Sequence, residues 1–211
     1  HLRNRRQRQM CIRDSLSTGG FKTSRTGFSL GTGFEQYSDL YVNLDISAYY
    51  EKLETASTAS AHKKKQEGDY LENLFNYKFR MNKLDQNYQP TQGYMLSFDQ
   101  ELPIYSDDLS VGNTLNFSKY HSVSDNLILS GKLFLKSVNS IDDDVRVSRR
   151  IYIPSKNLRG FEPGKIGPKD GVEYVGGNFG SALNLNSTIP NVLNGFENID
   201  LNFFFDAATL R

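Results

Sequence analysis

The sequence contains no tryptophan and a single cysteine, Cys11, among its 211 residues. One cysteine excludes an intrachain disulfide framework, and none remains after residue 11 for thiolate chemistry. Apolar residues make up 37% of the chain, and mean hydropathy is −0.54. No run approaches the roughly 18 consecutive apolar residues that a transmembrane helix needs, so such a helix is excluded. The net charge of +1 gives no overall attraction for nucleic acid.

Histidines are also scarce. Only His1, His62 and His121 are present, and they form no cluster with the spacing of a metal site or a catalytic triad. The glycine-containing stretch at 173–181 is not followed by a helical pattern, so it does not predict a phosphate-binding loop. We therefore expect a protein that is not an enzyme and that binds no metal or cofactor.

The first fifteen residues, HLRNRRQRQMCIRDS, differ from the rest of the chain. They contain five arginines and one aspartate, and they show no period of 2 or 3.6 residues. They resemble translated adapter sequence, which favours a non-native leader over the alternative of a basic arm. The apolar core of a secretory signal is missing from them. We expect the structured domain to comprise residues 16–211.

From Gly27 onward, apolar and polar residues alternate with period 2, which is the signature of half-buried strands. The pattern predicts eight strands, at 26–36, 40–52, 70–83, 93–104, 109–121, 126–138, 173–189 and 198–210. These are longer than the ~5–6 residues of soluble strands. They suit strands that cross a bilayer at a tilt, which need ~9–11 residues plus their ends.

The predicted connections alternate in length. Short ones lie at 37–39, 84–92, 122–125 and 190–197, whereas those on the other side lie at 53–69, 105–108 and 139–172. Short periplasmic turns and longer outer loops are typical of outer-membrane barrels. The stretch HKKKQEG, 62–68, is expected to be a solvated outer loop, with a lipid-binding basic patch as the alternative.

One face of the predicted strands is apolar, and the other is too polar for a dry interior. The polar faces carry Asp45, Glu51, Glu72, Lys78, Arg80, Asp99, Glu101, Lys132 and Lys136. A barrel with lipid outside and water inside explains both faces. The expected fold class is therefore all-β, an antiparallel transmembrane β-barrel. A soluble β-sandwich is the alternative, which the strand lengths disfavour.

Four short motifs resemble a known family. LRGF (158–161), followed by IGP (166–168), resembles the loop signature of the BamA outer-membrane assembly factor family, with Leu158 in place of the family's valine. The other three matches are QPTQG (89–93), VGGN (175–178) leading to IP (189–190), and NFFFDAA (202–208). They occur in the family's order, and the resemblance covers about residues 18–211.

The resemblance implies a partial barrel, with about eight of roughly sixteen strands. It implies a piece that starts part-way through the barrel and stops before the last strands, without the family's periplasmic POTRA repeats. It further implies a protein of the bacterial outer membrane that folds and inserts other barrel proteins. The implied partners are outer-membrane lipid, nascent outer-membrane barrel proteins and accessory assembly lipoproteins.

The resemblance also gives the candidate site. Its loop motif comprises Leu158, Arg159, Gly160 and Phe161. Strand alternation turns Asp206 toward the lumen, where a planar guanidinium could bind its carboxylate with two hydrogen bonds. Asn186 is the second expected partner and stands where the family has a glutamate. Ala208 likewise replaces a family glycine.

Gly164, Gly167 and Pro168 are expected to act as hinges that let the loop of residues 139–172 fold inward. The alternatives are that Arg159 is a solvated loop cation and that Asp206 is an unspecific lumen carboxylate. Two alternatives to the assembly function remain open. One is a secretion transporter of the same superfamily, and the other is a passive porin, which the loop motif disfavours. The number of POTRA repeats upstream would separate assembly factor from transporter.

Overall fold

The computed structural model describes the backbone of residues 6–18 and both backbone and side chains of residues 20–124, 126–141, 144–190, 192 and 199–211. Its main element is one nine-stranded antiparallel sheet in which the strands follow one another in sequence order. The strands are β1 (Arg6–Thr18), β2 (Phe21–Tyr37), β3 (Leu40–Thr55), β4 (Gly68–Asn82), β5 (Gly93–Ser106), β6 (Ser110–Ser124), β7 (Leu127–Ser140), β10 (Phe179–Ile189) and β11 (Leu201–Leu210).

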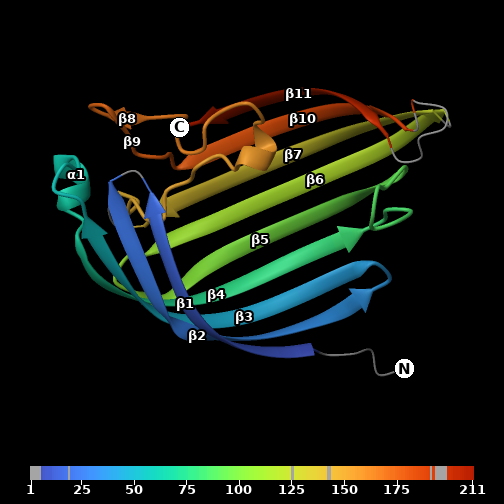
Figure 1. Cartoon of the computed structure of the whole chain (residues 1–211). Helices are drawn as coiled ribbons and strands as arrows, with labels where there is room; N and C mark the ends of the chain where they lie inside the picture. Colours follow the sequence, from blue (N-terminus) through green and yellow to red (C-terminus); the bar gives the residue numbers. More distant parts are fainter. Residues whose placement is uncertain (1–5, 19, 125, 142–143, 191, 193–198) are drawn as a thin grey trace.

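The sheet curls into an open trough, with β1 and β11 as its edge strands in the described part of the chain (Figure 1). Three short elements lie at one end of it (Figure 1): α1 (Ala61–Lys64), β8 (Lys169–Asp170) and β9 (Glu173–Tyr174). A fourth, η1 (Ser155–Asn157), lies further along, over the middle of β10. Within the described residues, no helix is long and apolar enough to cross a membrane.

Cross-strand register assigns every side chain to the inner or the outer face of the trough. Because Glu72 pairs with Tyr49, and Glu51 with Tyr70, these four side chains share the inner face. The outer face carries large exposed apolar side chains, among them Phe28, Leu30, Ile46, Phe79, Leu183, Leu185, Phe203 and Phe205. A wall that is apolar outside and charged inside is that of a membrane barrel.

All eight predicted strands are present, and the all-β antiparallel fold class is confirmed. Their ends differ most from the prediction in two places. The first predicted strand begins at Phe21 instead of 26, and the predicted strand at 173–189 begins only at Phe179. Residues 175–178 belong to a loop, so Val175 does not face lipid as alternation along a strand at 173–189 would predict. Its side chain is buried inside the trough.

A ninth strand, β1, was not predicted, because its basic sequence lacks alternation. It pairs with β2 along its whole length, from Arg6 opposite Gly33 to Thr18 opposite Phe21. The expected boundary between residues 15 and 16 therefore falls inside a strand. That residues 1–15 have a non-native origin stays a prediction.

The connections are sorted between the two ends of the trough as the sequence predicted. The turns at 38–39 and 83–92 lie at one end, and the connections at 56–67 and 107–109 lie at the other, together with residues 144–178 (Figure 1). In the usual barrel orientation the first end is periplasmic and the second is outside.

The main apolar core lies between the wall and the loop that follows β7. Wall residues Phe134, Val138, Ala182 and Leu210 pack against Val145, Ile151, Ile153 and Leu158 from this loop. A second, smaller cluster joins Phe21 and Leu53 to Val147. Burial of these side chains favours a loop that is packed against the inner wall over one that extends into solvent.

This topology predicts which surface cysteines can be labelled from outside the cell. Val172 lies in the long outer loop and is 92% exposed, whereas Tyr88 lies in a turn at the other end and is 80% exposed. In a full-length protein with Cys11→Ser, we expect Val172→Cys to react with a membrane-impermeant maleimide on intact cells. Tyr88→Cys should react only after the outer membrane has been permeabilised. The reverse pattern would invert the orientation.

Candidate functional site

The candidate site is the loop between β7 and β10, which lies on the inner face of the trough. We call its described residues, 144–178, the lumen loop. Its two ends are joined by a bridge between Ile151 and Gly177, whose backbone groups exchange hydrogen bonds of 2.8 and 3.0 Å. Between them come η1, the LRGF motif and the small β8–β9 hairpin.

Arg159 is bound to the wall through its side chain and its backbone. Its Nε and Nη2 donate to the two carboxylate oxygens of Asp206 at 2.7 and 2.5 Å, and its backbone N–H donates to the same group at 3.0 Å. Nη2 also donates to Oδ1 of Asn186 at 2.7 Å. The guanidinium lies 3.8 Å from the ring centroid of Phe204, which adds a cation–π contact.

The strands place these partners by register. Asp206 pairs with Asn184, and Phe204 pairs with Asn186, so all four side chains share the inner face. Asn184 donates through Nδ2 both to Asp206 at 2.7 Å and to the backbone carbonyl of Asn157 at 2.9 Å. The asparagine thereby connects the carboxylate to η1, immediately before the motif.

The chain around Arg159 is shaped by its neighbours. Leu158 is buried in the apolar core, which fixes the backbone just before the arginine. Gly160 follows with φ +81°, in the left-handed region that L side chains rarely adopt. A Cβ on Gly167 would lie only 2.6 Å from Cδ2 of Leu210, so the loop approaches β11 closely at that point.

The structure brings together Arg159, Asp206 and Asn186, as the sequence predicted. The other expected residues lie nearby with different surroundings: Phe161 is exposed, Gly164 has φ +75°, and the carbonyl of Pro168 accepts a hydrogen bond from the N–H of Val175. The hydrogen bond from Arg159 to Asp206 raises the pKa of the guanidinium. The functional role of these residues stays a prediction.

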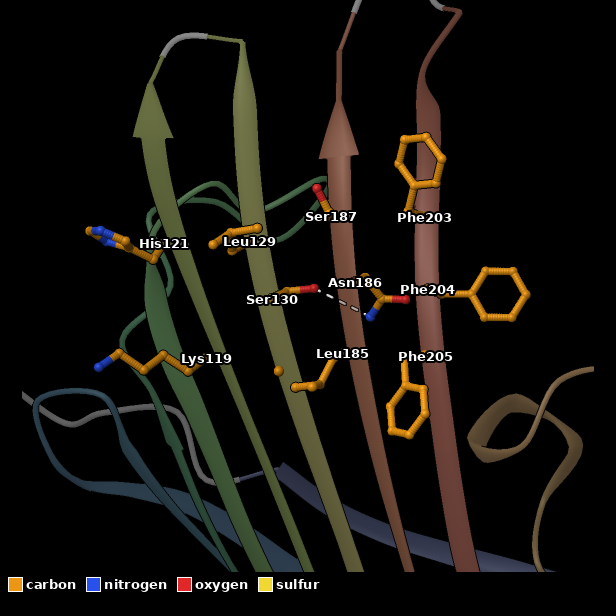
Figure 2. A pocket seen from close by; sticks show the side chains of 11 residues that line it. Lys119, His121, Leu129, Ser130, Leu185, Asn186, Ser187, Phe203, Phe204 and Phe205 are labelled. Carbon is orange, nitrogen blue, oxygen red and sulfur yellow. Dashed lines mark hydrogen bonds between the residues drawn. The ribbon is translucent and has the colours of Figure 1, made fainter.

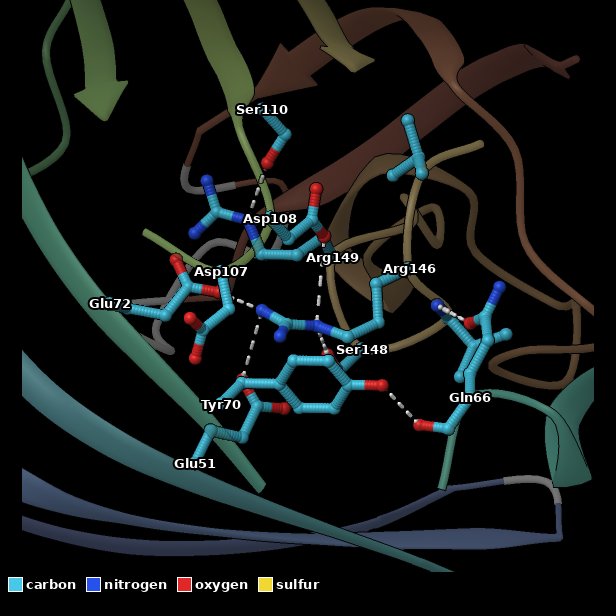
Figure 3. Close-up of polar contacts among 12 residues, drawn as sticks. Glu51, Gln66, Tyr70, Glu72, Asp107, Asp108, Ser110, Arg146, Ser148 and Arg149 are labelled. Atoms are coloured by element: carbon cyan, nitrogen blue, oxygen red, sulfur yellow. Dashed lines mark hydrogen bonds and ion pairs between the residues drawn. The ribbon is translucent and has the colours of Figure 1, made fainter. Parts of the chain in front are cut away.

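A second anchor, which sequence reasoning missed, is Arg146. It is buried against the opposite part of the wall, between Glu51 and Glu72, which are both fully buried (Figure 3). Its Nη2 forms an ion pair with Glu72 and lies 3.6 Å from Glu51, and the guanidinium lies 4.0 Å from the ring centroid of Tyr70. Burial lowers the pKa of Arg146, and the negative charge of Glu51 opposes this shift in part.

Two further arginines extend this anchor. Arg149 donates to Oγ of Ser110 at 3.2 Å, and its Nη2 lies 3.1 Å from a carboxylate oxygen of Glu101. Arg150 forms an ion pair with Asp144 at 2.5 Å and donates to the carbonyl of Val145 at 3.1 Å. Arg146 and Arg149 therefore reach β3, β4, β5 and β6 from one short segment.

A third contact joins the lumen loop to the connection between β3 and β4. Lys63 of α1 is fully buried, and its Nζ donates to Oε2 of Glu173 at 2.8 Å. The backbone N–H of Ser60 donates to the same oxygen at 3.4 Å. The Lys63 ammonium lowers the pKa of Glu173. The expectation of a fully solvated loop at 62–68 is therefore wrong for Lys63, although Lys64 and Lys65 are exposed.

The missed anchors had a recognisable signal. DVRVSRR, 144–150, places three arginines in one loop, and the inward faces of three neighbouring strands carry Glu51, Glu72 and Glu101. Arg25 of β2 lies opposite Glu51 and pairs with it, but Glu72 and Glu101 lie opposite no cation and need partners from elsewhere. The arginines, Lys63 and the carboxylates described above form ion pairs with one another. Among the described residues, no group of three or more histidine, cysteine, aspartate or glutamate side chains could hold a metal ion.

Double-mutant analysis in the full-length protein tests the Arg159 contact. We expect Arg159→Ala and Asp206→Ala each to increase cleavage of the lumen loop by protease, because each leaves a charged partner unsatisfied. The double variant should be less than additive, with a coupling of about 1 kcal/mol. The coupling is this modest because the Arg159 side chain is 37% exposed, although that of Asp206 is only 3% exposed.

The matched control for this cycle is Lys165→Ala. Lys165 and Glu162 form an ion pair in the same loop, but both side chains are more than half exposed. We expect its loss to leave cleavage unchanged. Strict additivity of the Arg159 and Asp206 effects would show that the contact contributes nothing specific to the loop.

Comparisons with known proteins agree with this architecture. The model of the Omp85 superfamily domain matches residues 4–211. In the crystal structure of BamA from Haemophilus ducreyi lacking POTRA domains 1–3, a similar fold recurs with a TM-score of 0.81 and 21% sequence identity. The match covers 90% of this chain and 42% of that one, so the chain spans less than half the length of its structural relative. A comparison with curated protein sequences found no match.

The family match begins at residue 4 and therefore includes all of β1. At 21% identity, the structural match shows similarity of fold alone. The family is one of assembly and transport proteins of the bacterial outer membrane. The chain belongs to the Omp85 superfamily and is a BamA-like part of a bacterial outer-membrane β-barrel.

Proposed function

We propose that the full-length protein is an outer-membrane assembly factor, which folds other barrel proteins and inserts them into the membrane. Superfamily membership supports a role in barrel assembly or transport. The observation that favours assembly is the lumen loop, which is bound at one end to β3 and β4 through Arg146 and further along to β10 and β11 through Arg159.

Through these contacts the lumen loop connects the two sides of the trough across its inside, and we call this connection the brace. Arg146 and Arg159 are 13 residues apart in the chain, yet their partners lie at opposite sides of the strand order. A loop that binds both sides opposes flattening of the sheet. A barrel that opens between its terminal strands to admit a new strand needs its remaining wall to keep its curvature while this happens.

The proposed mechanism involves no covalent chemistry. A nascent strand adds to an exposed sheet edge through backbone hydrogen bonds, and the edge acts as a template for the next strand. The chain described here supplies the braced wall. The proposed partners are nascent outer-membrane barrel proteins, the lipid of the outer membrane and accessory assembly lipoproteins.

A passive porin would have less use for this loop. Diffusion requires an aqueous path, whereas the lumen loop fills part of the inner face with a packed apolar core of Val145, Ile151, Ile153 and Leu158. A secretion transporter of the same superfamily would have to move its substrate past the loop. It would therefore need the anchors to release, whereas an assembly factor would need them to hold.

An assembly assay with the full-length protein in proteoliposomes tests the proposal. The client is an unfolded barrel protein whose folded form migrates differently on a gel unless it is heated. We expect Arg159→Ala and Asp206→Ala each to slow client folding several-fold, because the brace is lost on one side. Arg159→Lys should recover only part of the rate, since an ammonium cannot reproduce the two parallel hydrogen bonds of the guanidinium.

Lys165→Ala again serves as the control and should fold the client at the rate of the unmodified protein. The heat-modifiability of each variant itself shows that its own barrel has folded. Unchanged client folding with Arg159→Ala in a folded barrel would refute the brace. If the unmodified protein instead transfers a soluble substrate across the liposome and folds no client, it is a transporter.

A further inference from the structure

A groove lies on the outer wall, on the side of the sheet away from the lumen loop. Its volume is about 620 Å³, and its lining comes from four neighbouring strands, β6, β7, β10 and β11 (Figure 2). Two cross-strand rows contribute its outward side chains. One runs from Lys119 through Gly131 and Leu185 to Phe205, and the next runs from His121 through Leu129 and Ser187 to Phe203.

Gly131 leaves the space in which the groove forms. It stands at an outward position between Lys119 and Leu185. The remaining outward residues of β7 from 129 to 135 are all leucine. A Cβ built on Gly131 meets only Cδ2 of Leu185, at 3.6 Å, which is ordinary contact. The wall does not need glycine at this position for packing, so a larger side chain would fill the groove without a clash.

Lys119 gives the groove its charge. Among the outward-facing residues of β5, β6, β7, β10 and β11 that the structure describes, it is the single charged side chain, and it is exposed. A lysine on the lipid face is costly at the bilayer midplane and becomes tolerable near an interface. Its long apolar stem lets the ammonium reach the polar head groups while the stem stays on the wall.

The position along the strands identifies the interface. Lys119 and His121 lie near the end of β6 that leads into the turn to β7, which is the periplasmic end. Tyr94 of β5 pairs with Lys119 and also faces outward, and tyrosine is enriched at membrane interfaces. The groove therefore lies at the level of the periplasmic leaflet, with apolar walls next to a cation and an imidazole.

We propose that this groove binds a phospholipid of the periplasmic leaflet. One acyl chain lies over Gly131 and against Leu185 and Phe205, and the lipid phosphate lies at the Lys119 ammonium. His121 provides a second hydrogen-bonding group beside the head group. The wall would thereby hold one lipid in a fixed place, independently of what the lumen loop does.

Photo-crosslinking tests this site in the full-length protein. The probe is a phosphatidylglycerol with a diazirine in one acyl chain, present as a minor component of phosphatidylcholine bilayers, and mass spectrometry locates the crosslinks. We expect crosslinks to concentrate on Leu129, Leu185, Phe203 and Phe205. Gly131→Leu should reduce their yield about threefold or more, because the added side chain occupies the groove.

Lys119→Gln should reduce the same crosslinks by removing the charge that attracts the phosphate. The control is Ala207→Leu, which adds the same kind of apolar bulk to the exposed outer face of β11, two residues beyond Phe205 and outside the groove. It should leave the crosslinks unchanged.

Equal yields for Gly131→Leu and the unmodified protein would overturn the proposal, as would an equal loss with Ala207→Leu. Crosslinks spread evenly over outward positions such as Phe28 and Ile46 would do the same. If Gly131→Leu does not fold, as judged by heat-modifiability on a gel, Lys119→Gln still decides, because unchanged crosslinking in that variant would exclude a phosphate site.

Discussion

The carboxylates on the inner wall set the main constraint on this structure. Glu51 and Glu72 are fully buried, and the side chain of Asp206 is nearly so. A buried carboxylate without a partner is costly, and truncating one partner of a buried pair costs more than the pair contributes. Arg25 of β2 pairs with Glu51 at 3.2 Å. The lumen loop supplies Arg146, which pairs with Glu72 and lies near Glu51, and Arg159, which pairs with Asp206. Its path across the trough follows from where those carboxylates lie.

Apolar packing and ion pairing act together in this arrangement. Val147 packs against Phe21 and Leu53 next to the Arg146 anchor, and Leu158 packs in the larger cluster next to Arg159. The apolar contacts keep water away from the buried Arg146 anchor, which strengthens its charged contacts. The charged contacts in turn fix the orientation in which the apolar residues meet. The contact of Lys63 with Glu173 then attaches the far part of the loop to α1. A loop held at three places is suited to keep the wall curved.

The sequence predicts the strands well because each buries or exposes one face, and alternation records this directly. It predicts the contact of Arg159 with Asp206 for two reasons. Strand alternation shows that the Asp206 side chain points into the lumen, and the LRGF motif identifies Arg159 as its partner. It does not predict Arg146, Arg149 or the burial of Lys63, because a loop has no period that tells which of its charges turn inward. β1 escapes prediction for a related reason: a basic edge strand without alternation looks like a solvated segment, and only its pairing with β2 defines it.

Hydrogen exchange at two backbone amides tests most directly whether the lumen loop is bound to the wall. The N–H of Arg159 donates to Oδ2 of Asp206 at 3.0 Å, and that of Val147 donates to Oε1 of Gln66 at 2.7 Å. Both bonds join the loop to side chains of other segments, so they exist only while the loop stays in place. In the full-length protein in a bilayer, both amides should exchange far more slowly than in an unstructured peptide. Exchange of both at the unstructured rate would show that the loop is not fastened to the wall.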